Sequence, residues 1–367
     1  MATEWAGVVN TTTTHYLKGA EDHTVRDRIF LAMAKKKGRL MFNQDGKDIQ
    51  WQVEAIQPTV EAYGDAGNID FSRSNVYRTL TLDWRGYKVT DLMTEKEKLM
   101  NRGNAALINR YARIMPNLTK ALTDKFGEEL YIDGNATGND NRIHGLESFF
   151  GTGTTAAGDR IAEPSDTYGG KSTAVAQLDT TWDDTLSTQP NSTISTDWPE
   201  GKGSSGYDYL SPKIGNWSST AWGTGSTAWE DNCERVIGQM DIWATLGGGK
   251  AGKVDVCLLA GDLYYGYLNK QRAKQRIVVS PTSPLRELGF DSVNQEGIEI
   301  ATEFGVSADI GYGINFDELT LRAMYGQLFM PRGPEYDIKS DAYLFMVGFF
   351  GNATFNPKAH WKIDNIA

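Results

Sequence analysis

The sequence has 367 residues and a formal net charge of −10, with 40% hydrophobic and 23% charged residues. Its 10 Trp, 16 Tyr and 14 Phe residues exclude a wholly disordered chain, which lacks the aromatic side chains needed for collapse. The longest apolar run, from Leu344 to Phe350, is far shorter than the about 20 residues of a membrane span. The acidic excess argues against a dedicated binder of duplex DNA, because such a protein needs a basic surface.

The sequence contains two cysteines, Cys233 and Cys257. Two thiols are too few for a disulfide framework or for a zinc site with four thiolates. We therefore expect the protein to be made in a reducing compartment.

The N-terminal part divides into an arm and a short helix. Residues 1–24 have no apolar periodicity and read as an extended arm. Residues 25–37 predict a short helix with Ile29, Phe30 and Met33 on one face.

The next segment, residues 38–90, predicts an elongated β-hairpin. Hydrophobic residues alternate with polar ones along 49–55, which is the pattern of a half-buried strand. Asp45-Gly46 lies between this run and residues 39–42, and such a dipeptide is typical of a tight hairpin turn. Residues 76–84 predict a further strand. The alternating apolar side chains have no evident partner within the segment.

A long helix is expected next. Thr94 and Glu97 fit a capping box, in which each side chain accepts a hydrogen bond from the other residue's backbone amide. Pro116 should kink or divide the helix, and Gly134 should end it. The expected apolar stripe consists of Leu99, Leu107, Tyr111, Met115, Leu118, Leu122 and Phe126.

Residues 134–228 are rich in Gly, Ser and Thr and show little periodicity. A structureless loop of this length is unusual in a compact domain, so we expect a loop-rich subdomain anchored by aromatic side chains. Five tryptophans occur in or beside it, namely Trp182, Trp198, Trp217, Trp222 and Trp229.

The C-terminal part returns to regular structure. Helices are predicted over 228–245 and 261–274, with a buried strand at 254–259 between them. Strands are predicted over 298–304, 319–330 and 343–355, and Pro331-Arg-Gly-Pro334 is predicted to be a loop.

No motif in the sequence predicts a catalytic, cofactor or metal site. The four histidines, His15, His23, His144 and His360, show no metal-binding spacing. Gly247-Gly-Gly-Lys-Ala-Gly252 matches a dinucleotide-loop pattern, but it follows a predicted helix instead of a strand. Gly170-Lys-Ser172 resembles the end of a phosphate loop but has no hydrophobic strand before it. The acidic pair Asp183-Asp184, near several tryptophans, leaves a sugar-binding cleft as an alternative.

The expected architecture itself favours self-assembly. An extended two-stranded ribbon has little core of its own and exposes its edges. Such a ribbon makes sense when a neighbouring copy of the chain covers it.

The order of these elements resembles that of the major capsid protein of tailed phages, with the Hong Kong 97-type fold. Four local patterns are also similar to that family: Glu128-Glu-Leu-Tyr-Ile-Asp-Gly134 running to Ile143-His-Gly-Leu-Glu147; Tyr168-Gly-Gly-Lys-Ser-Thr173 with Trp182; Trp229–Leu259 followed by Gly261-Asp-Leu-Tyr-Tyr-Gly-Tyr-Leu268; and Gly348-Phe-Phe-Gly-Asn-Ala-Thr354.

The resemblance implies an α+β subunit with five parts. These are an N-terminal arm (1–37), an extended hairpin loop (38–91), a peripheral domain (92–228), an axial domain (229–338) and C-terminal strands that return to the peripheral domain (339–367). The peripheral domain would hold a spine helix (94–133) and the loop-rich insertion. Lys47, near the predicted hairpin tip, would be the candidate for the Lys–Asn cross-link that some family members form.

The resemblance also implies a structural role without enzymatic activity. The chain would form pentamers and hexamers and build the icosahedral head around double-stranded DNA, which it would contact non-specifically. Scaffolding, portal and decoration proteins are further expected partners. The protein would be made in the cytoplasm of a bacterial host and end in the virion, with no membrane association. Two alternatives remain open, another virion protein (tail tube or decoration) and a carbohydrate-binding protein that uses residues 182–229.

Overall fold

The computed structural model describes residues 28–55, 57–58, 60, 62–63, 76–100, 110–151, 160–175, 198–199, 208–274, 284–327 and 329–366. These residues fall into two compact units. The described residues of the first unit are 88–100, 110–123 and 329–348, and the second unit holds the others.

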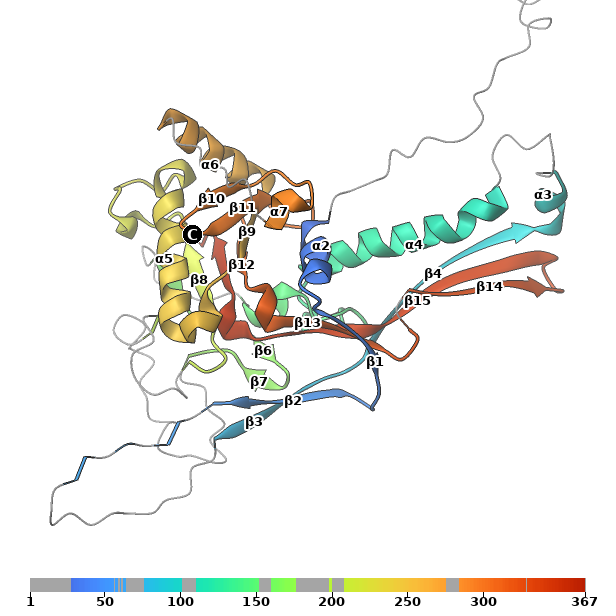
Figure 1. Ribbon diagram of the computed structural model, residues 1–367, viewed down its shortest axis with the longest axis horizontal. Helices are drawn as coiled ribbons and strands as arrows, with labels where there is room; N and C mark the ends of the chain where they lie inside the picture. The colour runs from blue at the N-terminus through green and yellow to red at the C-terminus, as the bar shows by residue number, and fades with distance from the viewer. Residues whose placement is uncertain are drawn as a thin grey trace, which may run out of the picture. The chain divides into compact units, whose positions relative to one another are not determined.

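The described residues form the helices and strands labelled in Figure 1. The helices are α2 (Ile29–Lys36), α3 (Glu95–Met100), α4 (Arg110–Glu129), α5 (Trp229–Gly248), α6 (Gly261–Ala273) and α7 (Pro284–Glu287). The strands are β1 (Leu40–Gln44), β2 (Ile49–Glu54), β3 (Tyr77–Leu82), β4 (Arg85–Thr94), β5 (Ile161–Ala162), β6 (Thr167–Tyr168), β7 (Lys171–Ser172), β8 (Lys213–Asn216), β9 (Val256–Leu259), β10 (Val293–Gln295), β11 (Ile298–Thr302), β12 (Gly311–Ile314), β13 (Leu319–Met324), β14 (Met330–Asp337), β15 (Ala342–Phe355) and β16 (Trp361–Asp364).

The second unit is built on a mixed seven-stranded sheet. Its strand order is β10-β11-β9-β12-β16-β8-β5, with parallel pairs at β11–β9 and β16–β8. Strands β8, β9 and β12 are buried at every residue, which explains the continuous apolar run of β9. Helix α5 packs against β8 and β16, and α6 packs against β9, β11 and α5 (Figure 1).

A close contact between two strands of this sheet makes Gly313 necessary. Gly313 lies opposite Trp361 in the β12–β16 register, and a Cβ atom at Gly313 would lie 2.0 Å from the Trp361 ring. Trp361 is fully buried, so its indole has no free space into which to move. We expect Gly313→Ala to lower the free energy of unfolding by about 2 kcal/mol in urea titrations. Gly261→Ala is the matched control, because nothing lies within 4 Å of that Cβ position, and an equal loss there would contradict this explanation.

The prediction that Asp45-Gly46 is a hairpin turn is wrong. Strand β1 pairs in parallel with β13, and β2 pairs with β3, so the strands on either side of Gly46 are not partners. Gly46 does have a positive φ, of 125°, but it turns the chain from one sheet to another. The hairpin is therefore β2–β3, and Lys47 lies on the β1–β2 connection instead of at the hairpin tip.

The predicted capping box is confirmed, but the helix is not one element. The Thr94 amide donates to Glu97 Oε2 (3.3 Å), and the Glu97 amide donates to Thr94 Oγ1 (3.2 Å). Residues 101–109, between α3 and α4, lie outside the described residues. Pro116 lies within α4 and does not divide it. The helix ends at Glu129, not at Gly134, because the Tyr131 amide closes the last turn by bonding Glu128 O.

The apolar stripe of α4 is confirmed in its second half. Leu118, Leu122 and Phe126 are buried, and Ile114 continues the same spacing of four. Leu99 lies in α3 and is 56% exposed, so it does not belong to the buried stripe. Leu107 lies outside the described residues, as does the side chain of Tyr111.

The prediction of a loop at 331–334 is also wrong. These residues belong to β14, which pairs antiparallel with β15 and has a register shift between Arg332 and Glu335. Strand β14 lies at the end of the strand order β1-β13-β15-β14 in a five-stranded sheet. The fifth strand, β4, pairs with β15. Proline is tolerated at a sheet edge and at bulges, because no partner there needs its missing N–H.

The other predicted helices and strands are confirmed, whereas α7, β8, β10, β12 and β16 are not predicted from the sequence. Helices α2, α5 and α6 and strands β9, β11 and β15 all occur where they are predicted. Residues 28–37 of the predicted arm include α2, whose Phe30 is fully buried, while residues 1–27 lie outside the described residues. The seven-stranded sheet combines strands from both sides of residue 228, and the five-part domain division stays a prediction.

Candidate assembly surfaces

The β2–β3 hairpin packs one face on its own chain. Trp51 and Leu80 are opposite each other in the ladder and point to the same face. The Trp51 ring meets the ring of Tyr168 edge-on at 6.1 Å, and the Thr81 amide donates to Gly169 O (3.1 Å). Tyr168 in turn donates its hydroxyl to Ala353 O of β15 (3.1 Å). The base of the hairpin therefore packs on residues of its own chain outside the segment 38–90, so a neighbouring copy is not needed to cover it there.

The far end of the hairpin differs from its base. The Ala55 amide donates to Val76 O (2.8 Å), which extends the ladder by one step beyond β2 and β3. Beyond this pair, Val60 is 94% exposed and Tyr63 is 70% exposed. Exposed hydrophobic side chains such as these are typical of a surface that another molecule covers. We call residues 56–75 the hairpin end.

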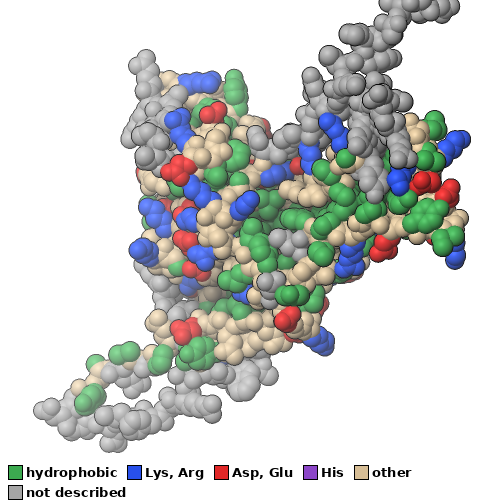
Figure 2. All heavy atoms as spheres, turned by 45° about the vertical axis from the view of Figure 1, so that its right-hand side comes forward, with side chains coloured by type: hydrophobic (Ala, Val, Ile, Leu, Met, Phe, Trp, Pro, Cys, Tyr) green, Lys and Arg blue, Asp and Glu red, His purple; other side chains and the backbone are tan. Residues whose placement is uncertain are grey.

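The first unit carries another set of exposed hydrophobic side chains, which we call the edge surface. Figure 2 shows hydrophobic side chains mixed with charged ones at the end that bears α3, β14 and β15. Every residue of β14 before Asp337 is exposed, so this strand has no buried face in its own unit. The edge surface consists of Leu92, Leu99, Met100, Met330, Tyr336, Ile338 and Leu344.

Polar contacts fix the shape of the edge surface. The Glu95 amide donates to Asp341 O (3.0 Å), which joins the start of α3 to the β14–β15 turn. Lys98 Nζ lies 3.8 Å from the centre of the Tyr343 ring, a cation–π contact. The Tyr336 hydroxyl donates to Asp341 Oδ1 (2.5 Å), and this bond raises the pKa of Tyr336 to about 12. The turn is thus held in one conformation although its side chains are exposed.

In the second unit, a buried carboxylate holds the start of α2. Glu303 Oε2 accepts hydrogen bonds from the Phe30 amide (2.9 Å) and the Tyr131 hydroxyl (2.7 Å). Burial raises the pKa of Glu303 to about 7, although both hydrogen bonds act in the opposite direction. Arg28 donates to Asp124 O of α4 (2.9 Å) and lies over the Phe304 ring. The chain that leaves the N-terminal segment is therefore anchored from residue 28 onward.

A second buried carboxylate closes the C-terminal end of α4. Glu129 is fully buried and accepts hydrogen bonds from Arg142 Nε (2.7 Å) and the Tyr87 hydroxyl (3.0 Å), with Lys125 Nζ at 2.9 Å. Burial opposes ionisation, but these donors hold the pKa of Glu129 below its usual value. The Ile143 amide donates to the same Tyr87 hydroxyl (2.7 Å). This Glu129 cluster joins α4, β4 and the segment at 142–143.

Four of the five tryptophans of the loop-rich segment are buried. Trp217 meets Trp229 edge-on at 5.9 Å, and Trp222 lies 6.0 Å from Trp243. Trp198 is 1% exposed, and Trp182 lies outside the described residues, as does Asp183-Asp184. The four described side chains anchor the core, as the sequence predicts, and do not present flat faces to a sugar.

Of the other motifs, the Gly247–Gly252 segment lies between a helix and a strand, as the sequence predicts. Gly247–Gly252 joins α5 to β9 and does not follow a strand, and Gly170–Ser172 forms part of the small β6–β7 hairpin. Cys233 and Cys257 are buried and free, and His15 and His23 lie outside the described residues. Within the described ranges, no cluster of three His, Cys, Asp or Glu side chains could hold a metal ion. None of the described helices has both the length and the hydropathy of a membrane span.

His144 and His360 are buried in neutral form, and this predicts acid sensitivity. Burial lowers the pKa of His144 to about 4 and that of His360 to about 3. Below pH 6.5 the unfolded chain takes up protons that the folded chain does not, so stability falls as the pH falls. Between pH 7 and pH 5, each histidine should lower the free energy of unfolding by about 2 kcal/mol.

The test compares the wild-type chain with His144→Gln in urea titrations of the unassembled protein at pH 7 and pH 5. The glutamine side chain does not titrate and can still accept from Asn352 Nδ2, which lies 2.9 Å from His144 Nδ1. Glu303 acts in the opposite direction, because its raised pKa favours the folded state as the pH falls. This contribution is the same in the wild type and the variant, so it cancels in the comparison. From pH 7 to pH 5, the free energy of unfolding of His144→Gln should fall by about 2 kcal/mol less than that of the wild type. Equal decreases in the two chains would contradict the conclusion that His144 is buried in neutral form.

Comparison with solved structures finds capsid structures that match nearly the whole chain. The capsid asymmetric unit of cyanophage A-1(L) has a TM-score of 0.58, with 14% identity and 96% of both chains covered. The capsid of the native GTA particle has a TM-score of 0.54 and 10% identity, with 100% of this chain and 98% of that chain covered. The capsid of cyanophage P-SCSP1u has a TM-score of 0.54 and 7% identity, with 97% of this chain and 94% of that chain covered.

No protein-family model and no curated protein matches the sequence. At identities of 7 to 14%, the structural likeness shows the fold and nothing finer. The chain has the α+β fold of these capsid subunits, and the expectation of a Hong Kong 97-type fold is confirmed.

Proposed function

We propose that this chain is a major capsid protein that assembles into the icosahedral head of a tailed DNA phage. The observation that carries the proposal is the likeness of fold to capsid subunits over 96 to 100% of this chain. A likeness that includes the hairpin and the first unit is more specific than one confined to a common core. The role is structural, with no catalytic, cofactor or metal site proposed.

The two exposed surfaces support assembly from copies of one chain. The hairpin end and the edge surface are different surfaces, and a ring of identical subunits needs two different complementary patches in head-to-tail contact. We propose that the hairpin end lies over an adjacent subunit, and that residues 1–27 also reach neighbouring copies. Rings of five and six would then close the shell.

The further partners follow from the same role. The acidic net charge of −10 suits a container whose wall does not bind duplex DNA tightly, so DNA contact would be non-specific. Scaffolding, portal and decoration proteins remain part of the proposal, as do synthesis in the bacterial cytoplasm and residence in the virion shell. The buried tryptophans lend no support to the carbohydrate-binding alternative.

Sedimentation velocity of the full chain, with multi-angle light scattering, tests the proposal. We expect masses of five and six times 40.6 kDa, or far larger closed particles. A stack of rings that grows into tubes would instead favour a tail-tube protein. A chain that stays at 40.6 kDa at high concentration and with crowding agents would contradict the proposal.

A further inference from the structure

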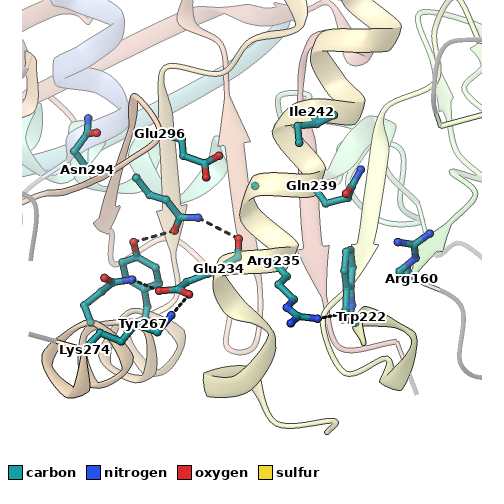
Figure 3. A pocket seen from close by; sticks show the side chains of 13 residues that line it. Arg160, Trp222, Glu234, Arg235, Gln239, Ile242, Tyr267, Lys274, Asn294 and Glu296 are labelled. Carbon is teal, nitrogen blue, oxygen red and sulfur yellow. Dashed lines mark hydrogen bonds and ion pairs between the residues drawn. The ribbon is translucent and has the colours of Figure 1, made fainter. Parts of the chain in front are cut away.

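A cavity of about 650 Å³ lies in the second unit between α5, α6 and the β10–β11 turn (Figure 3). One end of it is neutralised within the chain. Glu234 forms an ion pair with Lys274 and accepts a hydrogen bond from Gln271 Nε2 (2.8 Å). Tyr267 donates to Gln295 Oε1 (2.9 Å), and Gln295 donates to Glu234 O (3.1 Å).

The other end of the cavity carries two arginines without a carboxylate. Arg160 and Arg235 lie on either side of Trp222 (Figure 3). Arg235 Nη1 donates to Trp222 O (2.6 Å), while the Arg160 guanidinium lies 5.7 Å from the Trp222 ring centre and 5.5 Å from that of Trp243. In the described part of the chain, neither guanidinium forms an ion pair. A guanidinium presents several N–H donors in a planar fork, a geometry that suits a carboxylate.

The same unit carries two carboxylates without a cation. Asp262 lies in the first turn of α6, and Asp309 lies on the turn before β12, and both are exposed. Partial desolvation, and then the charge of Asp262 beside it, raise the pKa of Asp309 although its side chain is largely exposed. Among the described side chains, no Lys or Arg pairs with either one.

We infer that the Arg160–Arg235 pair of one subunit binds the Asp262–Asp309 pair of the next copy of this chain. A head-to-tail contact requires two different and complementary patches on each subunit, and these two unmatched pairs meet that requirement. The inference rests on the proposed function, since it names one contact within the ring. Charge pairs at such a contact fix the register of the neighbours and exclude wrong pairings.

Chemical cross-linking of the assembled full chain tests the contact directly. Arg160→Cys and Asp309→Cys are combined in one chain and treated with a short bismaleimide, which makes up the length lost from the arginine. The native Cys233 and Cys257 are buried and should not react. We expect a ladder of covalent species up to five or six chains on a denaturing gel, and only monomers from either single variant.

Charge reversal provides the second measurement. Arg160→Glu alone and Asp309→Arg alone should each reduce the assembled fraction about tenfold, and the two together should restore it. Lys250→Glu, at an exposed position in the same unit, makes the same charge change and should leave assembly unaltered. Assembly of the wild type with no ladder and no rescue would overturn the inference alone. Failure of the wild type to form rings or shells would overturn the proposed function, and the inference with it.

Discussion

Removal of the hairpin end should abolish shell formation and leave a folded chain. In this variant, residues 56–75 are replaced by Asn-Gly, which closes a two-residue turn between Ala55 and Val76. These two residues already share a backbone hydrogen bond of 2.8 Å, so the cut leaves the β2–β3 ladder intact. The exposed hydrophobic side chains of Val60 and Tyr63 are lost. Electron microscopy should show no closed particles.

The position of this deletion follows from the structure. A deletion of 40–56 would also remove β1, which pairs with β13 inside the second unit, and would confuse misfolding with failed assembly. Circular dichroism and urea titration should show that the shortened chain is as stable as the wild type. Tyr63→Ser should weaken assembly, while Tyr325→Ser, at an equally exposed tyrosine, should not. Normal shells from the shortened chain would contradict the role of the hairpin end.

Replacement of Glu129 should destabilise the folded chain more than the replacement of Gly313 or His144. Glu129→Ala leaves the Tyr87 hydroxyl and the Arg142 guanidinium without their buried acceptor, and it opens space at the end of α4. Loss of a fully buried charged partner typically costs about 3 kcal/mol. We expect this loss at pH 7 in urea titrations of the unassembled chain.

The pH dependence of the Glu129 effect has a definite sign. The folded-state pKa of Glu129 is lowered, so its contribution is present above the unfolded value of 4.5 and is lost as the pH falls below it. The difference between wild type and Glu129→Ala should therefore shrink in acid. Glu128→Ala is the matched control, because that neighbour is partly exposed and its ion pairs are worth about 1 kcal/mol or less. Equal effects at the two positions would contradict the assignment of the Glu129 cluster.

Local sequence patterns predict elements whose cause is local. The Thr94–Glu97 capping box depends on four consecutive residues only, and both of its hydrogen bonds are present. The apolar faces of α5 and α6 follow from a period that no distant partner changes. Strand β9 is recognisable because it is buried on both faces and so has no polar alternation.

Strand pairing could not be predicted in the same way. The alternation along residues 49–55 fixes which side chains share a face, but it does not identify the partner strand. Strand β1 pairs with β13, about 280 positions later in the chain, and the sequence of neither strand identifies the other as its partner. The prolines of β14 favour a loop by composition, and only the position of the strand at a sheet edge makes them acceptable.

The candidate contact surfaces were only partly predictable from sequence. Alternating residues predicted a hairpin that neighbours cover, but the packing of Trp51 on Tyr168 restricts this expectation to the hairpin end. Arg160, Arg235, Asp262 and Asp309, which form no ion pair among the described residues, come from segments far apart in the chain. Charges that lack partners become visible only when the fold shows which charges are already paired.

Negative-stain electron microscopy of the full chain expressed alone tests the assembly role most directly. We expect closed isometric shells tens of nanometres across, or free rings of five and six subunits. Single particles of 40.6 kDa that persist at high concentration, with crowding agents, would contradict the proposal that this chain builds a phage head.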